Sequence, residues 1–92
     1  MKVENMISDN GNKVPNQFII DDGNIHYIQS YKSIIVKQDL NGYNFTEQIY
    51  LDEKFWNCST TTGKYRNIFL NETKRDTEKK IKSGEYILTD LN

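Results

Sequence analysis

The chain has 92 residues, a hydrophobic content of 36%, a mean hydropathy of −0.78 and a formal net charge of −1. This length predicts one domain with a modest core, and the net charge excludes a simple polycation. An aromatic content of 12% favours an ordered domain, because each ring buries a large area. We expect no membrane association, since no stretch approaches the roughly 20 apolar residues of a membrane-spanning helix and no signal peptide is visible.

The only cysteine, Cys58, has no partner for an internal disulfide, which fits the reducing cytoplasm. Charge is divided unevenly along the chain. Residues 1–58 hold five Lys/Arg and eight Asp/Glu, whereas residues 59–85 hold seven Lys/Arg and four Asp/Glu. This split predicts two faces of opposite sign.

Residues 1–13 contain few apolar side chains and include Asp9-Asn10-Gly11-Asn12. This composition predicts a mobile N-terminal arm. The ordered part is then a single domain over residues 14–92.

Alternating apolar and polar residues predict strands in the first half of the chain, over residues 17–20, 25–31, 33–40 and 43–51. Asp21–Asn24 predicts a tight turn, and Asn41-Gly42 predicts a type I′ hairpin turn. The alternation places Tyr27 and Ile28 on opposite faces and Phe45 on an apolar face of the last strand. We therefore expect an antiparallel sheet with one face open to solvent.

The stretch from Leu51 to Leu70, LDEKFWNCSTTTGKYRNIFL, joins these strands to a helix. Ser59 is a candidate N-cap, and Tyr65 with Ile68 and Phe69 forms an apolar helical face. Trp56 precedes this helix. The aromatic rings are expected in the core, with the alternative that Trp56 or Tyr65 is half exposed and anchors a partner.

A second helix is expected over residues 71–83. Thr73 and Asp76 have capping-box spacing, and Gly84 stands where a left-handed C-terminal residue belongs. Residues 85–91 are expected to add an edge strand or to pack across a helix. The predicted fold class is α+β: an antiparallel meander of three to four strands, then two helices and a short C-terminal strand or tail.

Catalysis is not expected from this sequence. His26 is the only histidine and has no evident partner, and Cys58 is better explained as a thiol at the edge of the core. No His/Cys cluster has metal-ligand spacing, and the phosphate-loop and dinucleotide patterns are absent. We therefore assign no catalytic residue, metal or cofactor.

The basic segment is the functional signal that rises above background. Its cations are Lys64, Arg66, Lys74, Arg75, Lys79, Lys80 and Lys82. On a shared face they would follow a phosphate backbone. The alternative is a solvated helical surface in which Glu72, Asp76 and Glu78 are interleaved.

The stretches LDEKFWNCSTTTGKYRNIFL and KKIKSGEYILTDLN, with NQFII and IQSYKSIIV before them, carry a resemblance. Over residues 13–92 the chain resembles a family of small uncharacterised proteins of phages and mobile elements in low-GC Gram-positive bacteria. The resemblance implies an accessory protein that binds host machinery, and it transfers no site residues.

The leading hypothesis is a non-catalytic accessory protein in the host cytoplasm that binds and inhibits or redirects a host protein, such as a CRISPR effector or another defence nuclease. The alternative is a small nucleic-acid-binding protein that uses the basic helices. An enzyme would have to use His26 or Cys58. The candidate partner-binding residues are Lys64, Arg66, Lys74, Arg75, Lys79, Lys80, Lys82, Trp56 and Tyr65.

Overall fold

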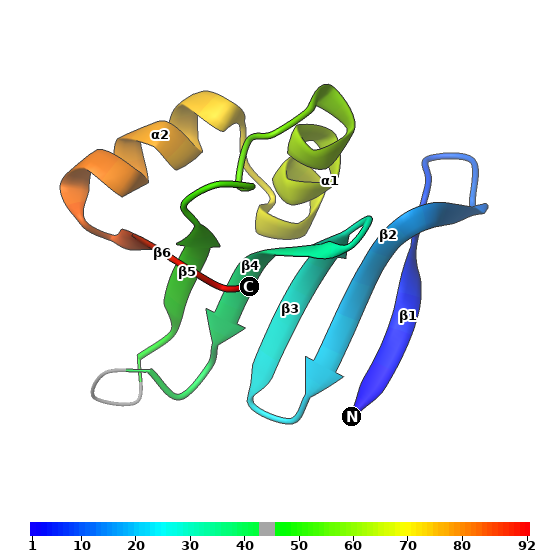
Figure 1. The fold of residues 1–92 in the computed structure, drawn as a ribbon, viewed down its shortest axis with the longest axis horizontal. Coiled ribbons are helices and arrows are strands. Elements are labelled where there is room, and N and C mark those ends of the chain that lie inside the picture. Colours follow the sequence, from blue (N-terminus) through cyan, green and yellow to red (C-terminus); the bar gives the residue numbers. More distant parts are fainter. Residues whose placement is uncertain (43–45) are drawn as a thin grey trace.

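The computed structural model describes residues 1–42 and 46–92, which form one β-sheet with two helices on one of its faces (Figure 1). The elements in chain order are β1 (Lys2–Ile7), β2 (Lys13–Asp22), β3 (Ile25–Ser30), β4 (Ser33–Asp39), β5 (Gln48–Asp52), α1 (Thr60–Leu70), α2 (Lys74–Ser83) and β6 (Tyr86–Thr89). The strands lie side by side in their order along the chain. Neighbours are antiparallel except for β6, which runs parallel to β5.

The mixed six-stranded sheet shows that the predicted meander of three to four strands is wrong. The stretch predicted as a mobile arm, residues 1–13, contains β1, which pairs with β2 from Lys2 opposite Asp21 to Ile7 opposite Lys13. Met6 is its only buried side chain. An edge strand is held by backbone hydrogen bonds and needs few apolar residues, so its polar sequence resembles that of an arm.

Of the two turns predicted from the sequence, one is present in the sheet and the other is not. Asp22 pairs with Ile25, and Gly23 between them has a φ of 69°, so the predicted turn at residues 21–24 is confirmed. The predicted two-residue turn at Asn41-Gly42 is wrong, because Asp39 pairs with Gln48 across a longer connection. The expected strand positions 43–45, including Phe45, lie outside the described residues.

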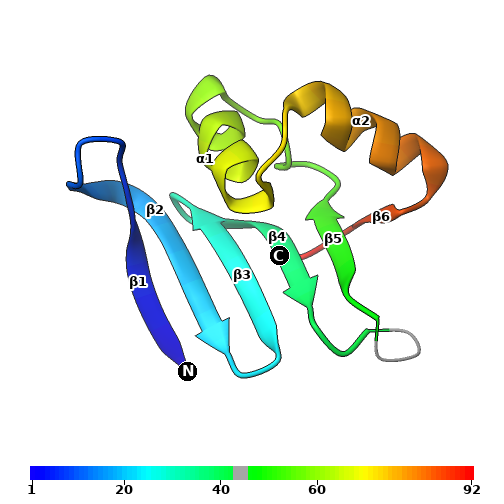
Figure 2. The same ribbon diagram turned by 180° about the vertical axis from the view of Figure 1, so that it is seen from behind.

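Both helices lie on one side of the sheet, over β3 to β6, and no described element covers the other face (Figure 2). Ile28, Val36 and Leu51 lie next to one another on the covered face and are fully buried. The opposite face carries a row of paired positions that crosses all six strands: Val3, Ile20, Tyr27, Lys37, Tyr50 and Ile87.

The helix ends form as the sequence predicts. Ser59 accepts a hydrogen bond from the backbone N–H of Thr62, and the Thr73/Asp76 capping box begins α2. Gly84, with a φ of 85°, ends α2. In the described ranges, neither helix is long and apolar enough to cross a membrane.

The buried stripe of α1 differs from the predicted apolar face. It consists of Thr62, Tyr65, Arg66 and the partly buried Phe69, at helical spacing, whereas Ile68 is 45% exposed. Thr62 hydrogen-bonds Ser30 of β3 at 2.8 Å, so a polar contact joins the helix to the sheet. Two polar side chains therefore occupy positions where periodicity alone predicts apolar ones.

Asp52, at the end of β5, fastens the residues that follow β6. The residue is 1% exposed, and its carboxylate accepts hydrogen bonds from the backbone N–H groups of Lys54, Phe55 and Leu91 and from the Asn92 side chain. Burial alone would raise the pKa of Asp52, but these hydrogen bonds outweigh it and lower the pKa below 3.8.

Candidate functional site

Arg66 is the side chain around which the candidate site is arranged. It has no exposed surface, although arginine is rarely buried without a charged partner. Its guanidinium lies 5.2 Å from the centre of the half-buried Trp56 ring, within the range of a cation–π contact. Two of the predicted partner-binding residues, Arg66 and Trp56, thus contact each other inside the protein.

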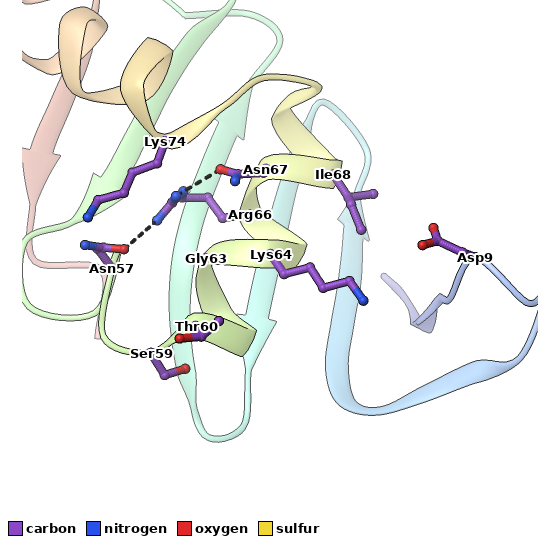
Figure 3. Close-up of a pocket in the computed structure, with 10 residues that line it drawn as sticks. All are labelled: Asp9, Asn57, Ser59, Thr60, Gly63, Lys64, Arg66, Asn67, Ile68 and Lys74. Carbon is purple, nitrogen blue, oxygen red and sulfur yellow. Dashed lines mark hydrogen bonds between the residues drawn. The ribbon is translucent and has the colours of Figure 1, made fainter.

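The hydrogen-bond acceptors of Arg66 among the described residues are all neutral. Nη1 donates to the Trp56 carbonyl oxygen at 2.6 Å and to Oδ1 of Asn57 at 3.3 Å, and Nη2 donates to Oδ1 of Asn67 at 2.9 Å. Nε has no acceptor among the described residues. The two asparagines come from different sides, Asn57 from the loop before α1 and Asn67 from α1 itself (Figure 3).

No carboxylate in the described part of the chain lies within 4.0 Å of the Arg66 guanidinium. Burial therefore lowers the pKa of Arg66, and the more distant charges of Glu72 and Glu78 oppose that shift only in part. Removing a cation from water costs free energy, and a nearby opposite charge mainly offsets that cost. A buried cation with only neutral acceptors lacks this compensation.

A shallow groove of about 800 Å³ runs past Arg66. Two predicted cations, Lys64 and Lys74, lie on its rim, one on α1 and the other at the start of α2 (Figure 3). Lys64 points to the same side of α1 as Asp9, from the loop between β1 and β2, whereas Arg66 and Lys74 lie on the other side (Figure 3). The structure thus brings Arg66 and Lys74 together, with Trp56 packed against Arg66, and does not bring Lys64 to them.

Tyr65 lies elsewhere. It is 6% exposed and belongs to the core cluster, so its ring is not available as a partner anchor. Of the two aromatic candidates, Trp56 is half-buried, whereas Tyr65 lies in the core as the first expectation has it.

Three predicted cations form a separate feature, which we call the α2 stripe: Arg75, Lys79 and Lys82. They are exposed and lie at i, i+4 and i+7, the spacing of one helix face. The buried Thr77 marks the opposite side of α2. The stripe therefore points away from the sheet.

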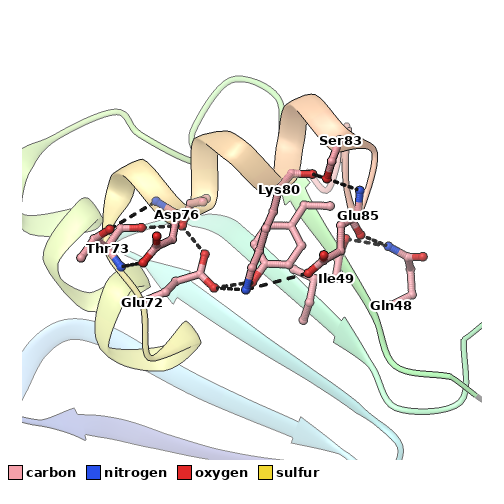
Figure 4. Close-up of polar contacts among 10 residues, drawn as sticks. Gln48, Ile49, Glu72, Thr73, Asp76, Lys80, Ser83 and Glu85 are labelled. Carbon is pink, nitrogen blue, oxygen red and sulfur yellow. Dashed lines mark hydrogen bonds and ion pairs between the residues drawn. The ribbon is translucent and has the colours of Figure 1, made fainter.

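Lys80 belongs to an internal network and not to the stripe (Figure 4). Its Nζ lies 2.8 Å from Oε1 of Glu72, which also accepts hydrogen bonds from the hydroxyl groups of Tyr86 and Thr77, both at 2.6 Å. The hydrogen bond to Glu72 raises the pKa of Lys80. For Glu72, burial would raise the pKa, but the three hydrogen bonds outweigh it and lower the pKa. Lys80 therefore anchors α2 to β6.

His26 and Cys58 do not come together. Cys58 Sγ lies 3.5 Å from Oγ1 of Thr62, which contacts Ser30, and His26 is four residues further along β3 from that contact. At roughly 3.4 Å per strand residue, the four residues from Ser30 to His26 span about 14 Å. His26 instead lies 3.3 Å from Oδ1 of Asp21. Among the described residues no group of three or more His, Cys, Asp or Glu converges as metal ligands do.

The sequence predictions did not include Asn57 and Asn67, which hold the Arg66 guanidinium. Asparagine is abundant throughout this chain, so composition does not distinguish these two. The burial of Arg66, which requires acceptors nearby, is seen only in the structure, so no sequence signal singled out these two asparagines.

The fold and these features define a small α+β domain whose helical layer carries a cationic groove and a cationic stripe. Residues 1–86 match DUF8033, a family of unknown function, and the chain belongs to this family. No curated protein and no solved structure matches the chain. The resemblance to phage and mobile-element proteins stays a prediction, because the family description gives no origin.

Proposed function

We propose that this chain is a non-catalytic binding protein that docks onto an acidic surface of another protein through its helical layer. The supporting observation is that the acids of this layer are engaged locally. Glu72 is bound by Lys80, the side chain of Asp76 accepts from the Thr73 backbone N–H, and Glu78 pairs with a lysine on its own helix.

The cations of this layer are less engaged than its acids. Within the described residues, no carboxylate lies within 4.0 Å of the charged groups of Lys64 or of the α2 stripe. Exposed unpaired cations attract an acidic partner over distances near the Debye length, about 8–10 Å at physiological salt. This predicts association that is accelerated at low salt.

A protein partner fits this surface better than a nucleic acid does. Binders of single strands combine cations and aromatic stacking platforms in one groove. Here Tyr27 and Tyr50 lie on the open face of the sheet, whereas the α2 stripe lies in the helical layer on the other side. Asp76 and Glu78 also interrupt the cations along α2, which disfavours a continuous track for phosphates.

The sequence resemblance extends this proposal to a particular setting. The partner would be a host protein in the bacterial cytoplasm, with a defence nuclease such as a CRISPR effector as the expected target. Inhibition would be steric, because a rigid domain bound over a functional surface excludes that surface from its substrate.

Affinity capture with the tagged full chain, expressed in a low-GC Gram-positive host, tests the proposal. The wild type is compared with the stripe variant Arg75→Glu/Lys79→Glu/Lys82→Glu, with and without nuclease treatment. Exposed ion pairs contribute about 0.2–1 kcal/mol each, and reversal replaces attraction by repulsion, so a loss of tenfold or more in affinity is expected.

The matched control reverses three exposed cations outside the helical layer: Lys2→Glu/Lys13→Glu/Lys32→Glu. A protein retained by the wild type and this control after nuclease treatment, but lost with the stripe variant, supports the proposal. Equal retention by both triple variants contradicts it, and capture that disappears with nuclease supports the nucleic-acid alternative instead.

A further inference from the structure

We propose that the free edge of β1 pairs with the same edge of a second copy of the chain, which makes the protein a homodimer with one continuous sheet. The two β1 strands would run antiparallel, with the Val3 residues of both copies opposite each other and Lys2 of each copy opposite Glu4 of the other. This inference goes beyond the proposed function, because it concerns the first strand and not the helical layer.

β1 is an exposed edge of the sheet. It pairs with β2 on one side, and both views of the fold show no described element on its other side (Figure 1, Figure 2). An edge strand presents unpaired backbone N–H and C=O groups, which are a template for another strand. β1 contains no proline, and its Val3 and Ile7 are 57% and 53% exposed. The edge is therefore open to pairing and partly apolar.

The direction of the backbone groups of β2 follows from the hairpin that joins it to β3. Its loop has two residues, so Asp22 and Ile25 form the hydrogen-bonded pair that closes it. The N–H and C=O groups of successive residues point to opposite sides of a strand. Asp22 and Ile20 therefore bond β3, whereas Asp21 and Ile19 bond β1.

This alternation identifies the groups of β1 that face outward. Lys2 and Glu4 lie opposite the two β2 residues that bond β1, so their backbone groups are used within the chain. The N–H and C=O groups of Val3, Asn5 and Ile7 point the other way. A second strand can therefore form hydrogen bonds with these three residues, and the pair across Lys2 and Glu4 joins side chains only.

Charge selects the register in which two β1 strands pair. Registers centred on Val3, Glu4 or Asn5 each bring outward backbone groups of both copies together. Centring on Glu4 places two carboxylates directly opposite each other, which is unfavourable. Centring on Asn5 places Glu4 opposite the buried Met6. Of these three registers, the one centred on Val3 alone places Glu4 opposite Lys2.

The edge is complementary to itself in this register. Lys2 Nζ lies 3.1 Å from Oε1 of Glu4, so the two side chains share one face of β1, and they are 72% and 63% exposed. Each would also meet its opposite charge in the second copy, in a non-hydrogen-bonded pair where side chains lie closest. Four charges of alternating sign then line one face of the interface, and the two Val3 side chains meet on the other.

A groove of about 370 Å³ along β1 provides the space for the second strand. It is lined by Val3, Glu4, Asn5, Ile7 and Lys13. Side chains from both faces of β1 contribute, so the groove follows the edge. Met1 of the second copy would lie opposite Asn5, where its side chain, 90% exposed in the single chain, contacts the apolar Ile7.

Sedimentation equilibrium of the purified full chain, over about 5–500 μM, tests the inference. We expect a dimer whose population rises with concentration. Lys2→Glu and Glu4→Lys each place like charges opposite each other and should weaken self-association at least tenfold. Lys32→Glu, in the exposed turn between β3 and β4, makes the same charge change away from the edge and should dimerise as the wild type does.

An equimolar mixture of Lys2→Glu and Glu4→Lys is the decisive sample, because their edges are again opposite in charge. The two variants should associate with each other about as tightly as the wild type associates with itself. Both substituted side chains are more than half exposed, and urea unfolding of each variant at low concentration checks that it is folded.

A chain that stays monomeric up to about 500 μM would overturn the inference. A dimer unaffected by either charge reversal, or a mixture no tighter than the separate variants, would also overturn it. The assay needs no partner, so its result is separate from the capture experiment. The capture control carries Lys2→Glu and is expected to be monomeric, but it keeps its own α2 stripe and should still retain the partner.

Discussion

Asn57→Asp is expected to stabilise the free protein at neutral pH. Oδ1 of Asn57 accepts from Nη1 of Arg66 at 3.3 Å, and the substitution keeps the shape while making this acceptor anionic. A neutral hydrogen bond contributes about 0.5–1.5 kcal/mol and one to a charged group about 1.5–3 kcal/mol. Because Asn57 is exposed, solvent screening reduces that difference.

A second contribution comes from the helix. Residue 57 lies just before the N-cap Ser59, where a negative charge adds about 0.3–1 kcal/mol. The net gain in unfolding free energy is therefore about 1–2 kcal/mol. For a domain of this size, 1 kcal/mol corresponds to a rise in Tm of about 4–8 °C.

Urea unfolding at low salt measures this gain against Asn24→Asp, the same change in the exposed turn between β2 and β3, as the control. A double-mutant cycle with Arg66→Gln isolates the pair, since the gain should shrink when the guanidinium is gone. Arg66 should hold the pKa of the introduced carboxylate below its ordinary value of about 3.9. The gain is then complete above that pH and disappears as pH falls through the lowered pKa. A variant no more stable than the wild type, or an equal gain without Arg66, would refute the electrostatic reasoning.

Asp52→Asn should lower the unfolding free energy by about 1–3 kcal/mol, because an amide NH₂ would face backbone donors. In the wild type, Asp52 contributes to the unfolding free energy in full above pH 3.8, and this contribution is lost as pH falls through its lowered pKa. Urea midpoints measured across acidic pH will show the loss. Glu72→Gln should also cost about 1–3 kcal/mol in chemical unfolding, since Lys80 loses its counter-ion. Burial, with the hydrogen bond to Glu72, raises the pKa of Tyr86 to about 12. The contribution of Tyr86 to the unfolding free energy is therefore complete below about pH 10 and is lost as pH rises through 12. Ultraviolet titration should find one tyrosine that ionises at a higher pH than the others. Gly63→Ala should stabilise α1 by about 0.5–1 kcal/mol in thermal unfolding, since the added methyl group meets Arg66 and Asn57 at 3.7 Å, an ordinary contact.

Features set by neighbouring residues were predictable from the sequence. Ser59 caps α1, and Thr73 with Asp76 begins α2, because each cap joins groups only three residues apart. The turn at Gly23 is equally local. Such interactions are visible in the sequence because both partners appear within one short motif.

Features set by distant residues were not predictable in the same way. β1 has a polar sequence and is a strand only because β2 lies beside it. Asn41-Gly42 has the local preference for a tight turn, but the register of Asp39 with Gln48 requires a longer connection. Pairing partners far along the chain override local preference in both cases.

The candidate site shows the same limit. Lys64 and Lys74 were recognisable as cations of two successive helices. Whether Arg66 faces solvent or the core depends on Trp56, Asn57 and the sheet beneath α1, which no helical periodicity reports. The sequence also counts Lys80 as a free surface cation, although its ion pair with the buried carboxylate of Glu72 engages it within the protein.

The place of β6 in the sheet has a consequence for the order of folding. Each of the strands β1 to β4 pairs with strands that are adjacent to it in the sequence. Their pairing therefore closes short loops and can proceed quickly. Pairing of β6 with β5 closes a loop that contains both helices, which carries a larger entropic penalty. The last strand should therefore join a sheet that is already assembled, and Asp52 would stay hydrated until Leu91 and Asn92 arrive to cover it.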